Sequence, residues 1–182
     1  MVAAMIKPLL AGIFGLFVGG CASTPRTAVV PAEKVDLPRY MGDWHVIANI
    51  PYFAEKGCYN SVETYRLTPE GKVDTVFKAR KGGFDGKLLK AGNVATVNDP
   101  GTNARWTASF LGGLIKIQLV ILAVSEDGRW AVVATPDAKL AWIFSRTPTL
   151  PRADHDAAVA VLQRSGVDAA RLAPVPQDGR KP

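Results

Sequence analysis

The chain has 182 residues, 48% of them hydrophobic, a net charge of +6 and two cysteines. This length is typical of one domain with a full core, and two cysteines are too few for a disulfide framework. The basic residues are not interleaved with aromatic residues on one face, which argues against a nucleic-acid-binding surface.

The first segment has the pattern of a lipoprotein signal peptide. Lys7 supplies a short positive region, residues 8–18 are apolar but too few to span a bilayer, and Gly19-Gly20-Cys21 follows. Small residues before a cysteine form a bacterial lipobox, so we expect residues 1–20 to be cleaved and Cys21 to be lipidated. Acyl chains on Cys21 would anchor the protein to a membrane.

The residue after the lipidated cysteine indicates a location. In proteobacterial lipoproteins, which this segment resembles, an Asp at that position favours retention at the inner membrane, but Ala22 stands here. We therefore expect a lipid-anchored protein of the bacterial outer membrane that faces the periplasm. Residues 21–35 mix Pro, Thr and Ala without periodicity and are predicted to be an acylated tether.

From residue 36 to residue 146 the pattern is that of short strands. Period-2 alternation and turn residues such as Asn98-Asp99-Pro100-Gly101 predict eight strands in meander order. The expected strands span residues 42–50, 61–67, 72–80, 84–97, 105–110, 115–124, 130–135 and 140–146. The strand at 115–124 is almost wholly apolar, so its alternation does not decide whether Leu119 or Val120 faces the interior.

The pattern changes to helical after Arg146. Pro151 stands at a first-turn position, acidic residues follow it, and apolar residues recur at helical spacing until Gly166. This predicts one amphipathic helix of about four turns that packs outside the sheet. Residues 36–176 are thus predicted to be the folded domain, and residues 177–182 a disordered tail.

One Trp near the start of the first strand and one Arg at the end of the last strand indicate a closure. Gly42 precedes this pair, Trp44 and Arg146. A guanidinium that lies over an indole gains a cation–π contact while its N–H groups donate to nearby carbonyls. We expect a barrel that is closed at this end and open at the other, a shape suited to holding a small molecule.

Two segments carry a resemblance to a known family. Residues 40–48, Tyr-Met-Gly-Asp-Trp-His-Val-Ile-Ala, resemble the first conserved region of the lipocalins, and residues 136–148 resemble the last, in the form found in bacterial outer-membrane lipocalins and apolipoprotein D. His45 departs from the usual Tyr, and the middle Thr-Asp-Tyr motif is not intact. The resemblance implies an all-β fold, an eight-stranded antiparallel up-and-down barrel with a C-terminal helix packed outside. It also implies a protein that is not an enzyme, has no cofactor and binds fatty acids or lysophospholipids for envelope maintenance.

Alternation and this resemblance together predict a ligand cavity. Five aromatic residues should converge in the interior, with alanines leaving room between them. The predicted ligand-binding residues are Phe77, Trp106, Phe110, Trp142 and Phe144. Trp142 carries the most weight because the matching family position lines the pocket. The alternative is a structural lipoprotein whose aromatic residues fill a solid core.

Two residues leave open questions. Glu63 shares the parity of Tyr65, and we expect it at the rim in water, because an inward carboxylate would be costly without a polar ligand or a cation. Cys58 has no partner if Cys21 is acylated, so it is either buried or a free thiol. An isomerase that uses Cys58 as a cavity thiol is a second alternative, although no activating group is evident beside it. Whether the protein forms a homodimer is not decided by the sequence.

A metal site is not expected. His45 and His155 lie far apart on elements of different types, and no Cys, His and Asp cluster has ligand spacing. The expected partners are therefore a hydrophobic small molecule and the membrane that holds the anchor.

Overall fold

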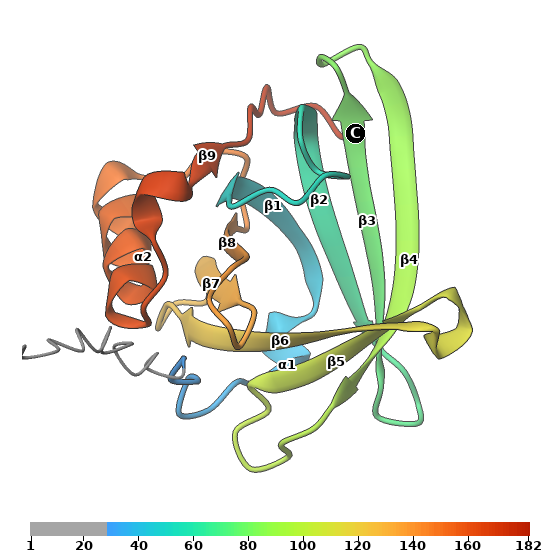
Figure 1. The fold of residues 1–182 in the computed structure, drawn as a ribbon, viewed down its shortest axis with the longest axis vertical. Helices are drawn as coiled ribbons and strands as arrows, with labels where there is room; N and C mark the ends of the chain where they lie inside the picture. Colours follow the sequence, from blue (N-terminus) through green and yellow to red (C-terminus); the bar gives the residue numbers. More distant parts are fainter. Residues whose placement is uncertain (1–28) are drawn as a thin grey trace, which may run out of the picture.

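The computed structural model describes residues 29–182. The predicted signal peptide, residues 1–20, and the lipidation site at Cys21 lie outside the described residues. Figure 1 shows a barrel of antiparallel strands with a helix against its outer surface.

Eight long strands follow one another around the barrel, and each pairs with its neighbours in the chain. The first strand also pairs with the last, which closes the sheet. The strands are β1 Gly42–Asn49, β2 Cys58–Leu67, β3 Val73–Lys81, β4 Lys87–Val97, β5 Arg105–Phe110, β6 Ile115–Val124, β7 Trp130–Ala134 and β8 Ala141–Ser145. The predicted eight-stranded up-and-down barrel is confirmed, with most strand ends within a few residues of the expected ones.

The strand β2 begins three residues earlier than expected. The β2–β3 register shifts between Tyr59 and Val62, and Asn60 has a positive φ of 48°. This bulge interrupts the alternation of side chains, so the pattern does not reveal the start of the strand.

The predicted outer helix is present as α2, Arg152–Arg164, which packs on β6, β7 and β8 (Figure 1). Ala158 and Leu162 are its fully buried residues. Four short elements complete the fold: α1 Leu37–Tyr40, the 3-10 turns η1 Leu111–Gly113 and η2 Ala169–Arg171, and β9 Ala173–Pro174, which pairs with β1.

Two groups of buried side chains divide the interior. One lies inside the barrel and contains the aromatic residues Tyr40, Trp44, Trp106 and Phe144. The other lies between the barrel wall and α2 and contains Ile143 and other apolar residues. In β1 and β6 to β8, alternate residues thus face the two layers, as the period of two requires.

The predicted tether is wrong for residues 29–35. Val29 and Val35 are both buried, at 2% exposed. The amide of Ala32 donates to the carbonyl of Ile121 at 2.9 Å, and that of Val35 to Thr102 at 2.7 Å. This segment has no regular secondary structure, so no periodic pattern in the sequence predicts its packing.

The predicted disordered tail is also corrected. Gln177 Nε2 donates to the backbone oxygens of Val46 at 2.9 Å and Ser61 at 3.2 Å. Asp178 accepts a hydrogen bond from Asn60 Nδ2 at 2.7 Å. Polar side chains hold the end of the chain across β1 and β2. Hydrophobic periodicity does not predict such contacts.

Candidate functional site: a closed cup with an acidic interior

The start of β1 and the end of β8 meet at one end of the barrel. The Arg146 guanidinium carbon lies 3.7 Å from the centre of the Trp44 ring. Its Nη1 donates to the Asp43 carbonyl at 3.0 Å, and its Nη2 to the Arg39 carbonyl at 2.6 Å. Gly42 has a φ of +98°, and a Cβ there would lie 3.4 Å from Arg146 Nη1. The expected closure contact is therefore present.

An aromatic layer forms the floor above this contact. Tyr40 from α1, Tyr65 from β2 and Trp106 from β5 have ring centres between 5.5 and 5.6 Å apart. The indole nitrogen of Trp106 donates to the Asn103 carbonyl at 2.7 Å, and that of Trp44 to the Tyr40 carbonyl at 2.8 Å. Both indole N–H groups donate to backbone carbonyls, so these donors at the closed end need no ligand as a partner.

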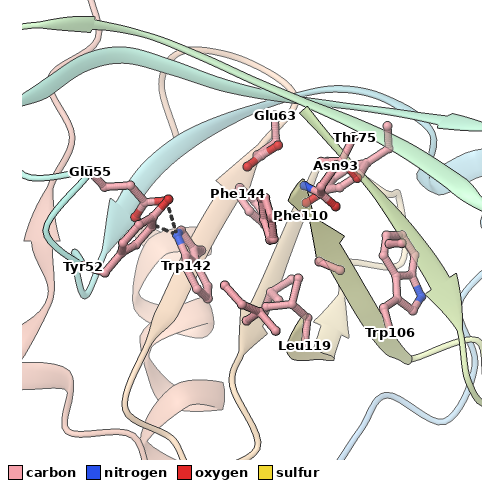
Figure 2. Close-up of a pocket in the computed structure, with 15 residues that line it drawn as sticks. Tyr52, Glu55, Glu63, Thr75, Asn93, Trp106, Phe110, Leu119, Trp142 and Phe144 are labelled. Carbon is pink, nitrogen blue, oxygen red and sulfur yellow. Dashed lines mark hydrogen bonds between the residues drawn. The ribbon is translucent and has the colours of Figure 1, made fainter. Parts of the chain in front are cut away.

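Above the floor the barrel contains a cavity that opens to solvent. Figure 2 shows aromatic and aliphatic side chains that converge on it from several strands. The lining residues are Tyr52, Glu55, Glu63, Tyr65, Thr75, Asn93, Ala95, Trp106, Ala108, Phe110, Ile117, Leu119, Val133, Trp142 and Phe144.

Four of the five predicted ligand-binding residues line this cavity: Trp106, Phe110, Trp142 and Phe144 (Figure 2). Phe77 is not among the lining residues. It pairs with Ala91 of β4, whereas β4 pairs with β5 only over Val94–Val97. Phe77 therefore has the inward parity but lies where the neighbouring wall is no longer continuous.

The structure decides the inward face of β6. Ile117 and Leu119 line the cavity, whereas Val120 joins the cluster beneath α2. The β6–β7 register shifts between Ile121 and Ala123, which moves the residues beyond it to a different parity.

Glu63 lines the cavity, and its expected position at a solvent-filled rim is wrong. Its Oε2 is enclosed and has no hydrogen-bond partner within the described residues. The register pairs Glu63 with Trp44, which places its side chain on the inner wall near the floor. Burial, and to a smaller extent the charge of Glu55, raise the pKa of Glu63 to about 8.

Glu55 enters the cavity from the loop between β1 and β2. Its Oε2 accepts hydrogen bonds from Asn49 Nδ2 at 2.6 Å and from Trp142 Nε1 at 3.1 Å, and its Oε1 lies 3.2 Å from the same indole nitrogen (Figure 2). Burial raises the pKa of Glu55 to about 7, while these two donors lower it. The loop is thereby fastened to the β8 wall.

Several cavity residues were not foreseen from the sequence. Tyr52 and Glu55 lie in a loop without periodicity, so no pattern could place them. Thr75 and Asn93, which face each other across β3 and β4, share the inward parity of their strands. A search for apolar lining residues misses them because they are polar, although the alternation of side chains along each strand indicates that they face inward.

Cys58 does not belong to the cavity wall. It is buried at the start of β2, and its Sγ donates weakly to the Ala54 carbonyl at 3.6 Å. Burial raises the pKa of the Cys58 thiol, an effect that Lys81 only partly offsets. A thiol held in its protonated form outside the cavity is a poor nucleophile for a cavity ligand.

Metal-binding groups and membrane-spanning helices are both absent from the described part of the chain. Residues 29–182 contain no group of three or more His, Cys, Asp or Glu side chains arranged to hold a metal ion. Within the same residues, no helix has the length and apolar character needed to cross a bilayer.

The comparison with family models finds a lipocalin-like domain over residues 35–177. The chain is 31% identical over 176 residues to the outer membrane lipoprotein Blc of Citrobacter freundii, covering 96% of this chain and 98% of that protein. It is also 31% identical over 179 residues to Blc of Escherichia coli K12, with the same two shares. Bovine apolipoprotein D is 26% identical over 156 residues, which cover 81% of this chain and 80% of that protein.

Solved structures share the fold. Insecticyanin from the tobacco hornworm Manduca sexta superposes with a TM-score of 0.64 at 20% sequence identity, covering 81% of this chain and 83% of that one. Lobster apocrustacyanin A1 gives a TM-score of 0.60, also at 20% identity, over 84% of this chain and 92% of that one.

Proposed function

The chain belongs to the lipocalin family, and from this premise we propose that it is a membrane-anchored carrier of single-chain lipids, fatty acids or lysophospholipids, for maintenance of the bacterial envelope. The observation that carries the proposal is the apolar cavity above a closed floor. Phe110, Trp142 and Phe144 offer aromatic surface to an alkyl chain.

The energetics are sufficient for useful binding. Each methylene group that leaves water contributes about 0.8 kcal/mol, so roughly ten buried groups give a gross contribution of about 8 kcal/mol. Part of this is lost to the restricted motion of the bound chain. Micromolar binding requires about 8 kcal/mol in total, so the aromatic contacts make up the difference.

The open end of the barrel carries exposed apolar side chains, which suit the exchange of a ligand with a lipid surface. Trp44 marks the closed end at the start of β1, so in an up-and-down barrel the β1–β2 and β5–β6 connections lie at the opposite end. These two connections hold the most exposed large apolar residues, Phe53 at 84% and Leu114 at 87%. Apolar side chains at a cavity mouth favour transfer of a lipid tail.

The proposed location rests on the N-terminal motif and on the relatives. Cys21 supplies the lipidation site of the anchor, and the similar Blc proteins are named outer membrane lipoproteins. We place this protein at the outer membrane facing the periplasm, where it would meet lipids that leave either membrane. The proposed role is binding, and the alternative of a cavity-thiol isomerase gains no support, because the buried Cys58 lies outside the cavity wall.

Titration of the delipidated protein tests the proposal. A neutral apolar fluorescent probe should bind saturably in a one-to-one complex, and palmitate or lysophosphatidylcholine should displace it. Trp142→Ala should weaken probe binding about tenfold because it removes a cavity wall. Trp130→Ala, a substitution outside the cavity beneath α2, is the matched control and should leave the affinity within about twofold. Absence of saturable binding by the folded protein would favour a structural lipoprotein instead.

A further inference from the structure

The ionisable groups of the cavity are acidic, whereas the chain as a whole is basic. The charged residues among its lining are Glu55 and Glu63, and no Lys, Arg or His of the described residues lines it. The chain as a whole carries a net charge of +6. An anionic ligand group that enters this cavity therefore meets two carboxyl groups and no compensating cation.

The two carboxyl groups differ in their hydrogen bonds. The oxygens of Glu55 are occupied by Asn49 and Trp142. Glu63 Oε2, in contrast, is enclosed and has no hydrogen-bond partner within residues 29–182. Asn93 Oδ1, also on the cavity wall, is a second enclosed acceptor without a partner in the described chain. Glu55 fastens its loop, whereas Glu63 and Asn93 both present acceptors that need a donor.

We infer that the cavity selects an apolar ligand that carries a protonated amine, and that the ammonium group donates to the Glu63 carboxylate. An ammonium group has three N–H donors and no acceptor, which matches the two enclosed acceptors without a partner, Glu63 Oε2 and Asn93 Oδ1. Figure 2 shows Glu63 pointing into the cavity that Phe110 and Phe144 also line, and the face of an aromatic ring attracts a cation. This inference rests on the proposed carrier function and moves the preferred ligand from a fatty acid to an amphiphile with an amine head group.

The position of Glu63 predicts the direction of the ligand. Its pairing with Trp44 sets the carboxyl group near the aromatic floor, deep in the barrel. The amine would thus enter first, and the apolar body would extend along Trp142 toward the mouth. A fatty acid that enters in the same direction would bring its carboxylate against Glu63 and is the poorest match for this site.

The ionisable groups around Glu63 make binding depend on pH. Glu55 and Tyr52 face it from the β1–β2 loop, Tyr65 lies on its own strand, and Tyr40 approaches from α1. None of these groups supplies a positive charge. With a pKa of about 8, Glu63 is mostly protonated at pH 7, so an ammonium ligand must displace its proton. Amine affinity should therefore rise between pH 7 and pH 8.5.

Three ligands with the same tail test the inference: decylamine, decanol and decanoate. Isothermal titration of the delipidated protein at pH 8 should show decylamine binding about tenfold tighter than decanol, and decanoate binding weakest. Glu63→Gln should bring decylamine to within about twofold of decanol. Glu33→Gln, the same substitution at an exposed position, should leave the preference unchanged. Glu63→Met provides a second, apolar variant if the glutamine variant does not fold.

The outcomes separate this inference from the proposed function. If decanol and decanoate bind but decylamine binds no tighter, the carrier function stands and the amine preference is rejected. If decylamine is preferred equally by the protein and by both Glu63 variants, the assignment to Glu63 is wrong. Failure of all three ligands to bind would instead count against the proposed carrier function itself.

Discussion

The closed end and the cavity wall of this barrel use polar groups in opposite ways. At the closed end, Arg146 donates to two carbonyls and lies over Trp44, and both indole donors of that region have backbone partners. In the cavity, Glu63 Oε2 and Asn93 Oδ1 have no partner in the described chain. A polar group with its partners in place stabilises the fold, whereas one without them is available to a ligand.

The largest expected effect of a substitution lies at the closed end. Trp44 is fully buried and contacts Tyr40, Phe144 and Arg146. Trp44→Ala should lower the free energy of unfolding by about 3–5 kcal/mol, because it leaves a cavity and removes the surface under Arg146. Urea unfolding followed by circular dichroism measures this. A loss below about 1 kcal/mol would mean that the closure does not stabilise the barrel.

Glu63 in the cavity differs from the closed end, because ionisation of its buried carboxyl group should destabilise the fold. The pKa of Glu63 is raised from 4.5 to about 8, so the unfolded chain releases this proton at lower pH than the folded protein. The free energy of unfolding should therefore fall as pH rises from about 4.5 to about 8, by an amount on the order of 2–4 kcal/mol.

Glu63→Gln should remove most of this slope, so its stability relative to the unsubstituted protein should increase with pH. Urea unfolding at pH 5 and at pH 8.5 measures the difference, with Glu33→Gln as the control. Glu55 contributes a smaller slope of the same sign in all variants, because burial raises its pKa to about 7. Parallel pH profiles for Glu63→Gln and the control would show that Glu63 is not buried in solution.

A milder change tests the geometry of the closure. Arg146→Lys keeps the charge but lacks the planar guanidinium that reaches both the Asp43 and Arg39 carbonyls. We expect a loss of about 1–2 kcal/mol in the free energy of unfolding. Arg129→Lys, at a side chain 56% exposed, is the matched control and should change stability by less than about 0.5 kcal/mol. Equal losses would contradict a specific role for Arg146.

The smallest expected effect distinguishes two phenylalanines. Phe110 lines the cavity, whereas Phe77 has the same inward parity but does not. Phe110→Ala should weaken binding of a neutral apolar probe about fivefold to tenfold, and Phe77→Ala less than about twofold. Fluorescence titration measures both. A larger loss in Phe77→Ala would extend the binding surface toward the β3–β4 hairpin.

The sequence predicted the barrel and its closure well because both depend on patterns. Period-2 alternation locates the eight strands, and the Trp44 and Arg146 pair depends on residue types at strand ends. The packing of residues 29–35 and of Gln177 was missed because irregular backbone and polar side chains make those contacts. Glu63 was predicted at the rim for a different reason. Its parity pointed inward, but the cost of a buried carboxylate argued for the rim.

A cavity-filling variant tests the central claim, that this barrel holds a ligand above a closed floor, most directly. Ala108 lies on the cavity wall and is 3% exposed. A neutral apolar probe should bind the delipidated protein in a one-to-one complex, and Ala108→Phe should lower its affinity at least tenfold while the protein stays folded. Unchanged affinity in the folded variant would place the ligand elsewhere and contradict the account.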